Sequence, residues 1–220
     1  MASMGANNIT VGVSQKSTSQ ETTSSGMTFS MGPRFTKMTE DDYISDEMLD
    51  SLEERYGDSI QGFSLTESVG SGTAQLGSLY AYVNATGVNE ANLENTDLTL
   101  LAGRTLTERD QIEAKKVCLV SDYLVNNLFN GNNMAAVGQT VDVLFNSRYY
   151  TYTIVGVYKY EESDMGFSSS SEEDTETTLY LPLQTAKNQT HNTNGYSQFT
   201  ILTASGVSAT SFCEMVENYM

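Results

Sequence analysis

The chain has 220 residues, 39% of them hydrophobic, which is enough to bury the core of one large domain or two small ones. Its 28 acidic residues outnumber 11 basic ones, and the resulting net charge of −17 disfavours partners such as nucleic acid or anionic lipid. No run of about 18 apolar residues indicates a membrane-spanning helix, and the first residues lack the basic and apolar regions of a signal peptide.

The N-terminal region predicts a short strand and then a loop. Residues 8–14 alternate apolar and polar side chains, which is typical of a strand with one buried face. Residues 14–31 are rich in Ser, Thr and Gln and predict a mobile loop or a weakly specified hairpin. The alternating apolar residues are Ile9, Val11 and Val13.

Residues 39–56 carry the clearest helix pattern. Thr39 and Asp42 have the spacing of a capping box, which predicts the helix start. Gly57 is suited to the left-handed position that ends many helices. One stripe of the helix is apolar, so we expect it to pack against a sheet. The stripe consists of Ile44, Met48, Leu49, Leu52 and Tyr56.

The next segment, residues 60–95, predicts two strands and a polar turn. The strands are expected at 60–69 and 74–85, with Gly70-Ser71-Gly72 as the tight turn between them. Residues 87–95 are polar and are expected to lead into a new subdomain.

The central segment, residues 98–158, contains most of the ordered pattern. A polar turn is followed by an apolar strand, a short amphipathic helix and a hairpin. The predicted elements are the turn at 103–110, the strand at 117–120, a helix with Leu124, Val125, Leu128 and Phe129 on one stripe, and a hairpin of 141–145 and 150–158 turning at Asn146-Ser147.

The C-terminal region predicts alternating loops and regular elements. Pro182 favours an edge position or a strand end, because proline lacks the N–H that a sheet requires. The expected elements are a mobile Ser- and acid-rich loop at 166–178, a strand at 178–183, a polar loop at 186–195, a strand at 198–203 and a helix at 208–220.

These elements predict an α+β fold with a split outer subdomain. Strand-helix-strand at the front and strand-strand-helix at the back favour one discontinuous α/β subdomain, residues 1–86 plus 166–220. Residues 87–165 are then an inserted β-rich subdomain with a short helix.

The chain shows no catalytic, cofactor-binding or metal-binding pattern. Its one histidine, His191, lies in a polar stretch, and with two distant cysteines it does not make a usual zinc site. Neither a G-x-S-x-G elbow nor a phosphate-binding G-x-x-x-x-G-K-[ST] loop is present. We expect Cys118 and Cys213 to be free and largely buried rather than bridged. We therefore expect no enzyme activity and no cofactor, with the substrate-binding residues unknown.

Two sets of residues each have two possible roles. Acidic clusters at 161–164 and 172–174 are either a solvated face, which is favoured, or a calcium site. Tyrosines around the hairpin either pack on the core or stack against a ligand, and the first is favoured. They are Tyr149, Tyr150, Tyr152, Tyr158 and Tyr160.

The order of the central elements resembles a known family. It contains L-x-x-G-R-x-L-T-x-x-D at 100–110, then a strand, a short helix ending in Leu-Phe, V-G-Q-T-V at 137–141, a hairpin and I-V-G-V at 154–157. This order is similar to the extracytoplasmic core domain of MacB-type ABC transporter permeases. The preceding strand-helix-strand and the later proline-containing strand extend the resemblance over nearly the whole chain.

The resemblance implies a porter-like outer layer and a non-catalytic, outward-facing domain of a membrane transporter. It would serve export or mechanical coupling, with ATP hydrolysed by a separate domain or subunit. Implied partners are that ATP-binding subunit, a second permease copy, and an envelope adaptor or exported substrate. Arg104 in the motif is expected to tie the turn to carbonyls or a carboxylate. The alternatives are a free-standing secreted or surface adhesin-like module, or a hydrolase that uses His191. Flanking apolar segments in the full gene would distinguish the first two.

Overall fold

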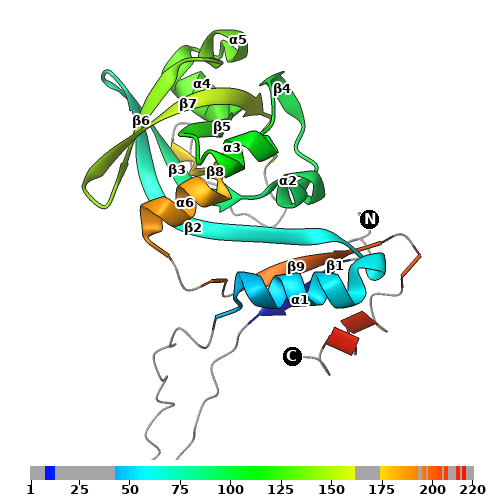
Figure 1. The fold of residues 1–220 in the computed structure, drawn as a ribbon. Coiled ribbons are helices and arrows are strands. Elements are labelled where there is room, and N and C mark those ends of the chain that lie inside the picture. The colour runs from blue at the N-terminus through cyan, green and yellow to red at the C-terminus, as the bar shows by residue number, and fades with distance from the viewer. Residues whose placement is uncertain are drawn as a thin grey trace, which may run out of the picture. The chain divides into compact units, whose positions relative to one another are not determined.

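The computed structural model forms two compact units, shown as a ribbon in Figure 1. One unit comprises Met1–Gln61 and Asn194–Met220, and the other comprises Gly62–Thr193. The structure describes residues 8–12, 43–161, 174–192, 195–196, 198–204, 206–207, 212–213 and 215–216.

The first unit is built from two paired strands and a helix. Strands β1 (Asn8–Gly12) and β9 (Gln198–Thr203) are antiparallel, with Ile9 opposite Ile201. Helix α1 (Asp46–Tyr56) buries Leu49 and Leu52, and a 3-10 turn (Gly57–Ser59) follows it. The Tyr56 and Phe212 rings meet edge to face at 5.6 Å, so residues from both ends of the chain share this core.

Helix α1 is shorter than predicted. It begins at Asp46, where the Ser45 hydroxyl accepts the N–H of Met48 at 3.3 Å. Ile44 precedes the helix and forms a β-bridge with Tyr196, so its burial comes from strand pairing rather than from the helix stripe. The left-handed end expected at Gly57 was also wrong, because this residue has φ −53° and starts the 3-10 turn. The proposed cap at 39 and 42 lies outside the described residues.

The second unit is organised around a closed ring of strands. Each pairs with the next in the order β2, β3, β8, β5, β7 and β6, and β6 pairs back to β2. β4 pairs with β7 outside the ring path. The ring strands are β2 (Ile60–Leu76), β3 (Leu79–Val88), β5 (Val117–Ser121), β6 (Thr140–Phe145), β7 (Arg148–Tyr158) and β8 (Thr177–Pro182); the other elements are α2 (Glu90–Thr96), β4 (Leu100–Gly103), α3 (Glu108–Ile112), α4 (Asp122–Phe129), α5 (Asn133–Ala136) and α6 (Leu183–Thr190).

The main core of this unit is formed by the alternate residues of the strands that face the inside of the ring. Ala81, Val83 and Ala85 are the alternate buried residues of β3, and they join inward-facing residues of the other ring strands and one stripe of α4. A second cluster lies around Leu119 and Tyr158, to which α2 contributes Leu93. Helix α6 packs on β3 so closely that Ala186 occupies the space a side chain at Gly87 would need. Burial of these apolar faces holds the ring and helices together.

The first predicted turn of this unit was wrong. Strand β2 continues through Gly70-Ser71-Gly72 with a bulge between Ser68 and Gly70, and the chain reverses at Gly77 and Ser78. The glycine-rich segment stays extended because it pairs with β3, and Thr73 also pairs with β6. The stretch 87–95, expected to be a polar turn, contains the start of α2, which Asn89 caps through Asn92 N–H.

In the C-terminal region one prediction was wrong and one was confirmed. Residues 183–190 form helix α6, where a polar loop had been expected over 186–195. Pro182 does end β8, but β8 is an interior strand between β3 and β5 rather than an edge. Pro182 then stands at the N-cap of α6, so its missing N–H falls where a helix needs none.

Several local predictions were confirmed. The strand at 117–120, the helix with the Leu124 stripe and the hairpin turning at Asn146 and Ser147 correspond to β5, α4 and β6–β7. Neither of the described cysteines forms a disulfide; Cys118 is buried and Cys213 partly so. The loop 14–31 and most of 166–178 and 208–220 lie outside the described residues.

The fold is mixed α/β and rich in sheet, but its compact units have other boundaries than the expected ones at 86/87 and 165/166. Strand β3 pairs with β8 along its second half, and β8 borders β5, so strands assigned to the outer subdomain join the inserted one. The boundaries fall at Gln61/Gly62, within β2, and at Thr193/Asn194.

Candidate functional site

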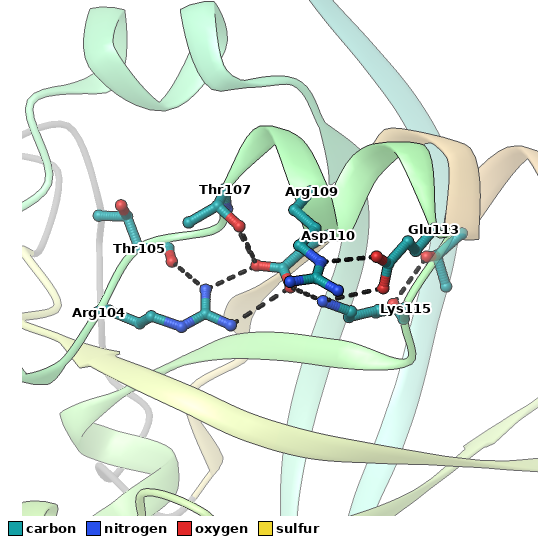
Figure 2. Close-up of polar contacts among 8 residues, drawn as sticks. Arg104, Thr105, Thr107, Arg109, Asp110, Glu113 and Lys115 are labelled. Atoms are coloured by element: carbon teal, nitrogen blue, oxygen red, sulfur yellow. Dashed lines mark hydrogen bonds and ion pairs between the residues drawn. The ribbon is translucent and has the colours of Figure 1, made fainter.

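The Arg104 motif forms a dense polar cluster at the start of α3. Figure 2 shows the Arg104 guanidinium donating to both oxygens of Asp110, with Nη1 2.6 Å from Oδ2 and Nη2 3.3 Å from Oδ1. Nη1 also donates to the Thr105 carbonyl at 2.8 Å. The backbone N–H and the hydroxyl of Thr107 donate to Asp110 Oδ2 at 3.0 and 2.8 Å. The arginine thus ties the turn as the sequence predicted.

Two further cations, Arg109 and Lys115, add ion pairs to the cluster. Lys115 Nζ lies 3.3 Å from Asp110 Oδ1 and 3.2 Å from Glu113 Oε2, and Arg109 Nε lies 2.6 Å from Glu113 Oε1 (Figure 2). Burial raises the pKa of the Asp110 carboxyl, but hydrogen bonds from Arg104, Thr107 and Lys115 outweigh it and hold that pKa well below its usual range. Asp110 is therefore ionised and saturated with donors.

The backbone around the cluster fixes Arg104 against β7. Arg104 N–H donates to the Val155 carbonyl at 2.9 Å. Gly103, with φ +77°, lies so close to Val155 and Gly156 that no side chain fits. The contacts of the cluster join a turn, helix α3 and strand β7. A saturated, buried carboxylate is not poised to accept a proton or a ligand.

The other polar residues singled out in the sequence do not form a reactive site. His191 is exposed and ends α6 in a left-handed conformation. Burial raises the pKa of the Cys118 thiol, which favours the unreactive protonated form. Within the part of the chain that the structure describes, no three His, Cys, Asp or Glu side chains gather as a metal site would require. Most residues of the two acidic clusters, 162–164 and 172–173, lie outside it.

The hairpin tyrosines divide between core and surface. Tyr152 and Tyr158 are buried, Tyr150 and Tyr160 are partly buried, and Tyr149 is exposed. The Tyr158 hydroxyl donates to the Thr178 carbonyl at 2.7 Å, and burial raises the pKa of Tyr158. The favoured packing role is therefore confirmed for Tyr152 and Tyr158.

Sequence reasoning missed one polar contact that borders open space. The Tyr152 hydroxyl donates to Gln189 Oε1 on α6, and Gln189 lines two hollows beside β7. The sequence had predicted a polar loop over 186–195, which includes Gln189. The helical spacing of the buried residues Leu183 and Ala186, directly after Pro182, was the signal that could have placed it.

The sequence matches the MacB-like periplasmic core domain family over residues 1–219. The chain belongs to this family. It is thus a MacB-like periplasmic core domain, the outward-facing region of an ABC transporter permease, as the order of the central elements had indicated. Among the described residues, the structure contains no helix with the length and apolar character to cross a membrane.

Solved structures share the fold of this MacB-like domain. The periplasmic region of MacB from Actinobacillus actinomycetemcomitans aligns with a TM-score of 0.57 and 21% identity, covering 77% of this chain and 69% of that one. The extracellular domain of the noncanonical ABC-type transporter YknZ from Gram-positive bacteria aligns with a TM-score of 0.57 and 20% identity, covering 76% and 77%. A comparison with curated protein sequences gave no match.

Proposed function

We propose that this domain serves export or mechanical coupling across a membrane and performs no chemistry itself. ATP is hydrolysed by a separate domain or subunit that the permease contacts through its membrane segments. A second permease copy and an envelope adaptor or exported substrate are the other partners. The observation that carries the proposal is the family match along residues 1–219.

Two structural features support a coupling role. Strand β1 pairs with β9 within one compact unit, which agrees with a domain inserted between membrane segments. Strand β2 passes from that unit into the other one without a break in its strand conformation, since Ile60–Leu76 is one strand and the boundary falls after Gln61. A flexible Gly/Ser-rich linker behaves as a random coil, whereas a continuous strand leaves no such segment at the unit boundary. The split outer layer with an inserted subdomain remains part of the proposal.

The test is to make the chain flexible at the two unit boundaries, called crossings below, in the full-length transporter. Two glycines are inserted after Gln61 and two after Thr193, and a matched control carries the same insertion after Gly77, in the β2–β3 turn. Reconstituted transporters are then assayed for basal ATP hydrolysis and for transport of a substrate that the parent moves. Softened crossings should leave basal hydrolysis intact and reduce transport at least about tenfold, while the control behaves as the parent. Unchanged transport in a folded crossing variant would show that this domain does not carry the coupling.

The free-standing alternative makes a different expectation. If the chain is a secreted or surface module, the full gene contains no apolar segments of about 20 residues before Asn8 or after Met220. Reading the flanking sequence decides between the two.

A further inference from the structure

Two adjoining hollows lie between α6 and the first half of β7. The larger has a volume of about 480 Å³ and is bordered by Val69, Phe145, Arg148 and Tyr150. The smaller, about 240 Å³, is bordered by Lys116, Tyr150, Tyr152 and Asn188. Tyr150 and Gln189 line both, so the two spaces share one wall. The larger volume lies in the range of pockets that hold small organic ligands.

The shared wall contains an unsatisfied donor. Gln189 Oε1 accepts from the Tyr152 hydroxyl, and Nε2 is the amide atom turned away from it. Its Nε2 is buried and has no hydrogen-bond partner among the described residues. A buried N–H group without an acceptor is costly, and native proteins seldom keep one without a reason. The position therefore calls for an acceptor from outside the chain.

The charges around the hollows are positive in a chain that is strongly acidic overall. Lys116 borders the smaller hollow and Arg148 the larger, and neither makes an ion pair with any residue the structure describes. By contrast, Arg104, Arg109 and Lys115 in the same unit are all paired with carboxylates.

No carboxylate is among the described residues that line the hollows. Glu67 contacts the lining residue Thr190 and is already occupied, because it accepts from Thr190 Oγ1 at 2.7 Å and from Asn192 Nδ2 at 2.9 Å. The space thus offers cations and an amide donor, while the carboxylate at its border is occupied.

We propose that these hollows bind a small organic anion with an apolar or aromatic body. Its carboxylate accepts from Gln189 Nε2 and faces Lys116 and Arg148, and its body packs against the Tyr150 ring. Because Nε2 is closed to solvent, binding includes a small shift of the Gln189 side chain. Charge-assisted hydrogen bonds of this kind are stronger than neutral ones, so the ligand's charge decides affinity. The site does not depend on the proposed coupling role.

The probe is N-acetylphenylalanine, with N-acetylphenylalanine amide as its neutral match. Each is titrated into the ¹⁵N-labelled 220-residue chain, and the side-chain amide of Gln189 and the backbone signals of Lys116 and Tyr150 are followed. The carboxylate should shift these signals saturably and bind at least about fivefold more tightly than the amide. Equal affinity of the two probes, absence of saturable shifts, or shifts confined to other parts of the chain would each overturn the proposal.

Variants separate the parts of the site. Lys116→Ala with Arg148→Ala should weaken the carboxylate at least about tenfold, whereas Lys159→Ala, which removes one exposed charge away from both hollows, should not. Gln189→Met keeps the chain length but removes the donor, and should weaken binding. Tyr152→Phe removes the hydroxyl that bonds Gln189 Oε1 but keeps Gln189 Nε2. Its melting temperature measures the loss of stability that comes from breaking the Tyr152–Gln189 hydrogen bond, which Gln189→Met breaks as well. Parent-like affinity in both the folded double variant and the folded Gln189→Met variant would contradict the assigned anion site.

Discussion

Arg104 Nη1 lies 2.6 Å from Asp110 Oδ2, and the two ends of this ion pair sit in different surroundings. The Asp110 side chain is 1% exposed, whereas that of Arg104 is 47% exposed. A buried carboxylate depends on its partners, because an unpaired charge in the interior is strongly destabilising. The pair therefore joins the turn to α3, and the backbone N–H of Arg104 bonds the same turn to Val155 on β7.

Replacing Asp110 should show how much the hydrogen bonds of its carboxylate contribute to stability. Asp110→Ala removes the acceptor of Arg104, Thr107 and Lys115, and we expect the free energy of unfolding to fall by about 3 kcal/mol. Urea unfolding at pH 7 measures the change. The control is Glu113→Ala in the same cluster, which is exposed to solvent and should change stability little. Equal losses in the two variants would contradict a special role for Asp110.

The same carboxylate predicts a pH dependence of definite sign. Its pKa in the folded chain lies below the ordinary value, despite burial, because of its hydrogen bonds. Its contribution to stability is therefore fully present above about pH 4, the ordinary carboxyl range, and is lost as the pH falls through the lower folded pKa. The stability difference between the parent and Asp110→Asn should be similar at pH 7 and pH 5 and smaller at pH 3. A difference that grows on acidification would show the opposite sign.

Leu52 and Met48 offer a matched pair on α1. Leu52 is 0% exposed and Met48 is 38% exposed. Leu52→Asp places an unpaired carboxylate in the core of the first unit and should cost about 4 kcal/mol, enough to unfold that unit. Met48→Asp should change the melting temperature little. The measurement is thermal unfolding followed by circular dichroism; parent-like melting of Leu52→Asp would show that the helix stripe is not core.

Gly87 and Ala186 should compensate for each other. A methyl group at Gly87 collides with the Ala186 side chain, so Gly87→Ala should destabilise by about 2 kcal/mol through overpacking. Ala186→Gly removes the obstacle but weakens α6 by about 1 kcal/mol. The double variant should be more stable than the sum of the single losses predicts, which a double-mutant cycle in urea measures. Additive losses would place the collision elsewhere.

The isolated domain should bind no ATP. The sequence contains no phosphate-binding glycine loop, and the proposed function assigns ATP hydrolysis to another domain or subunit. Calorimetric titration of ATP with Mg²⁺ into the 220-residue chain should give no saturable heat. Micromolar binding would count against the proposed division of labour.

Local patterns predicted those elements whose ends are set by neighbouring residues. The Leu124 stripe and the positive φ angles of Asn146 and Ser147 follow from helical spacing and turn chemistry. The motif predicted that Arg104 ties the turn to carbonyls or a carboxylate, and the structure shows the Thr105 carbonyl and Asp110 in those roles. The start of α1 was misplaced because Ile44 is buried by pairing with Tyr196, a residue far along the chain.

The sequence alone determined the periodic elements, the absence of a recognisable catalytic motif and the family, since these rest on residue types at short spacing. Tertiary structure decided the rest. Gly70-Ser71-Gly72 stays extended because two other strands pair with β2, and Pro182 lies inside the sheet because β5 returns beside β8. The Tyr152–Gln189 contact joins residues on β7 and α6, and only the folded chain brings them together. Pairing between distant segments depends on the closure of the whole ring, and no local pattern encodes that energy.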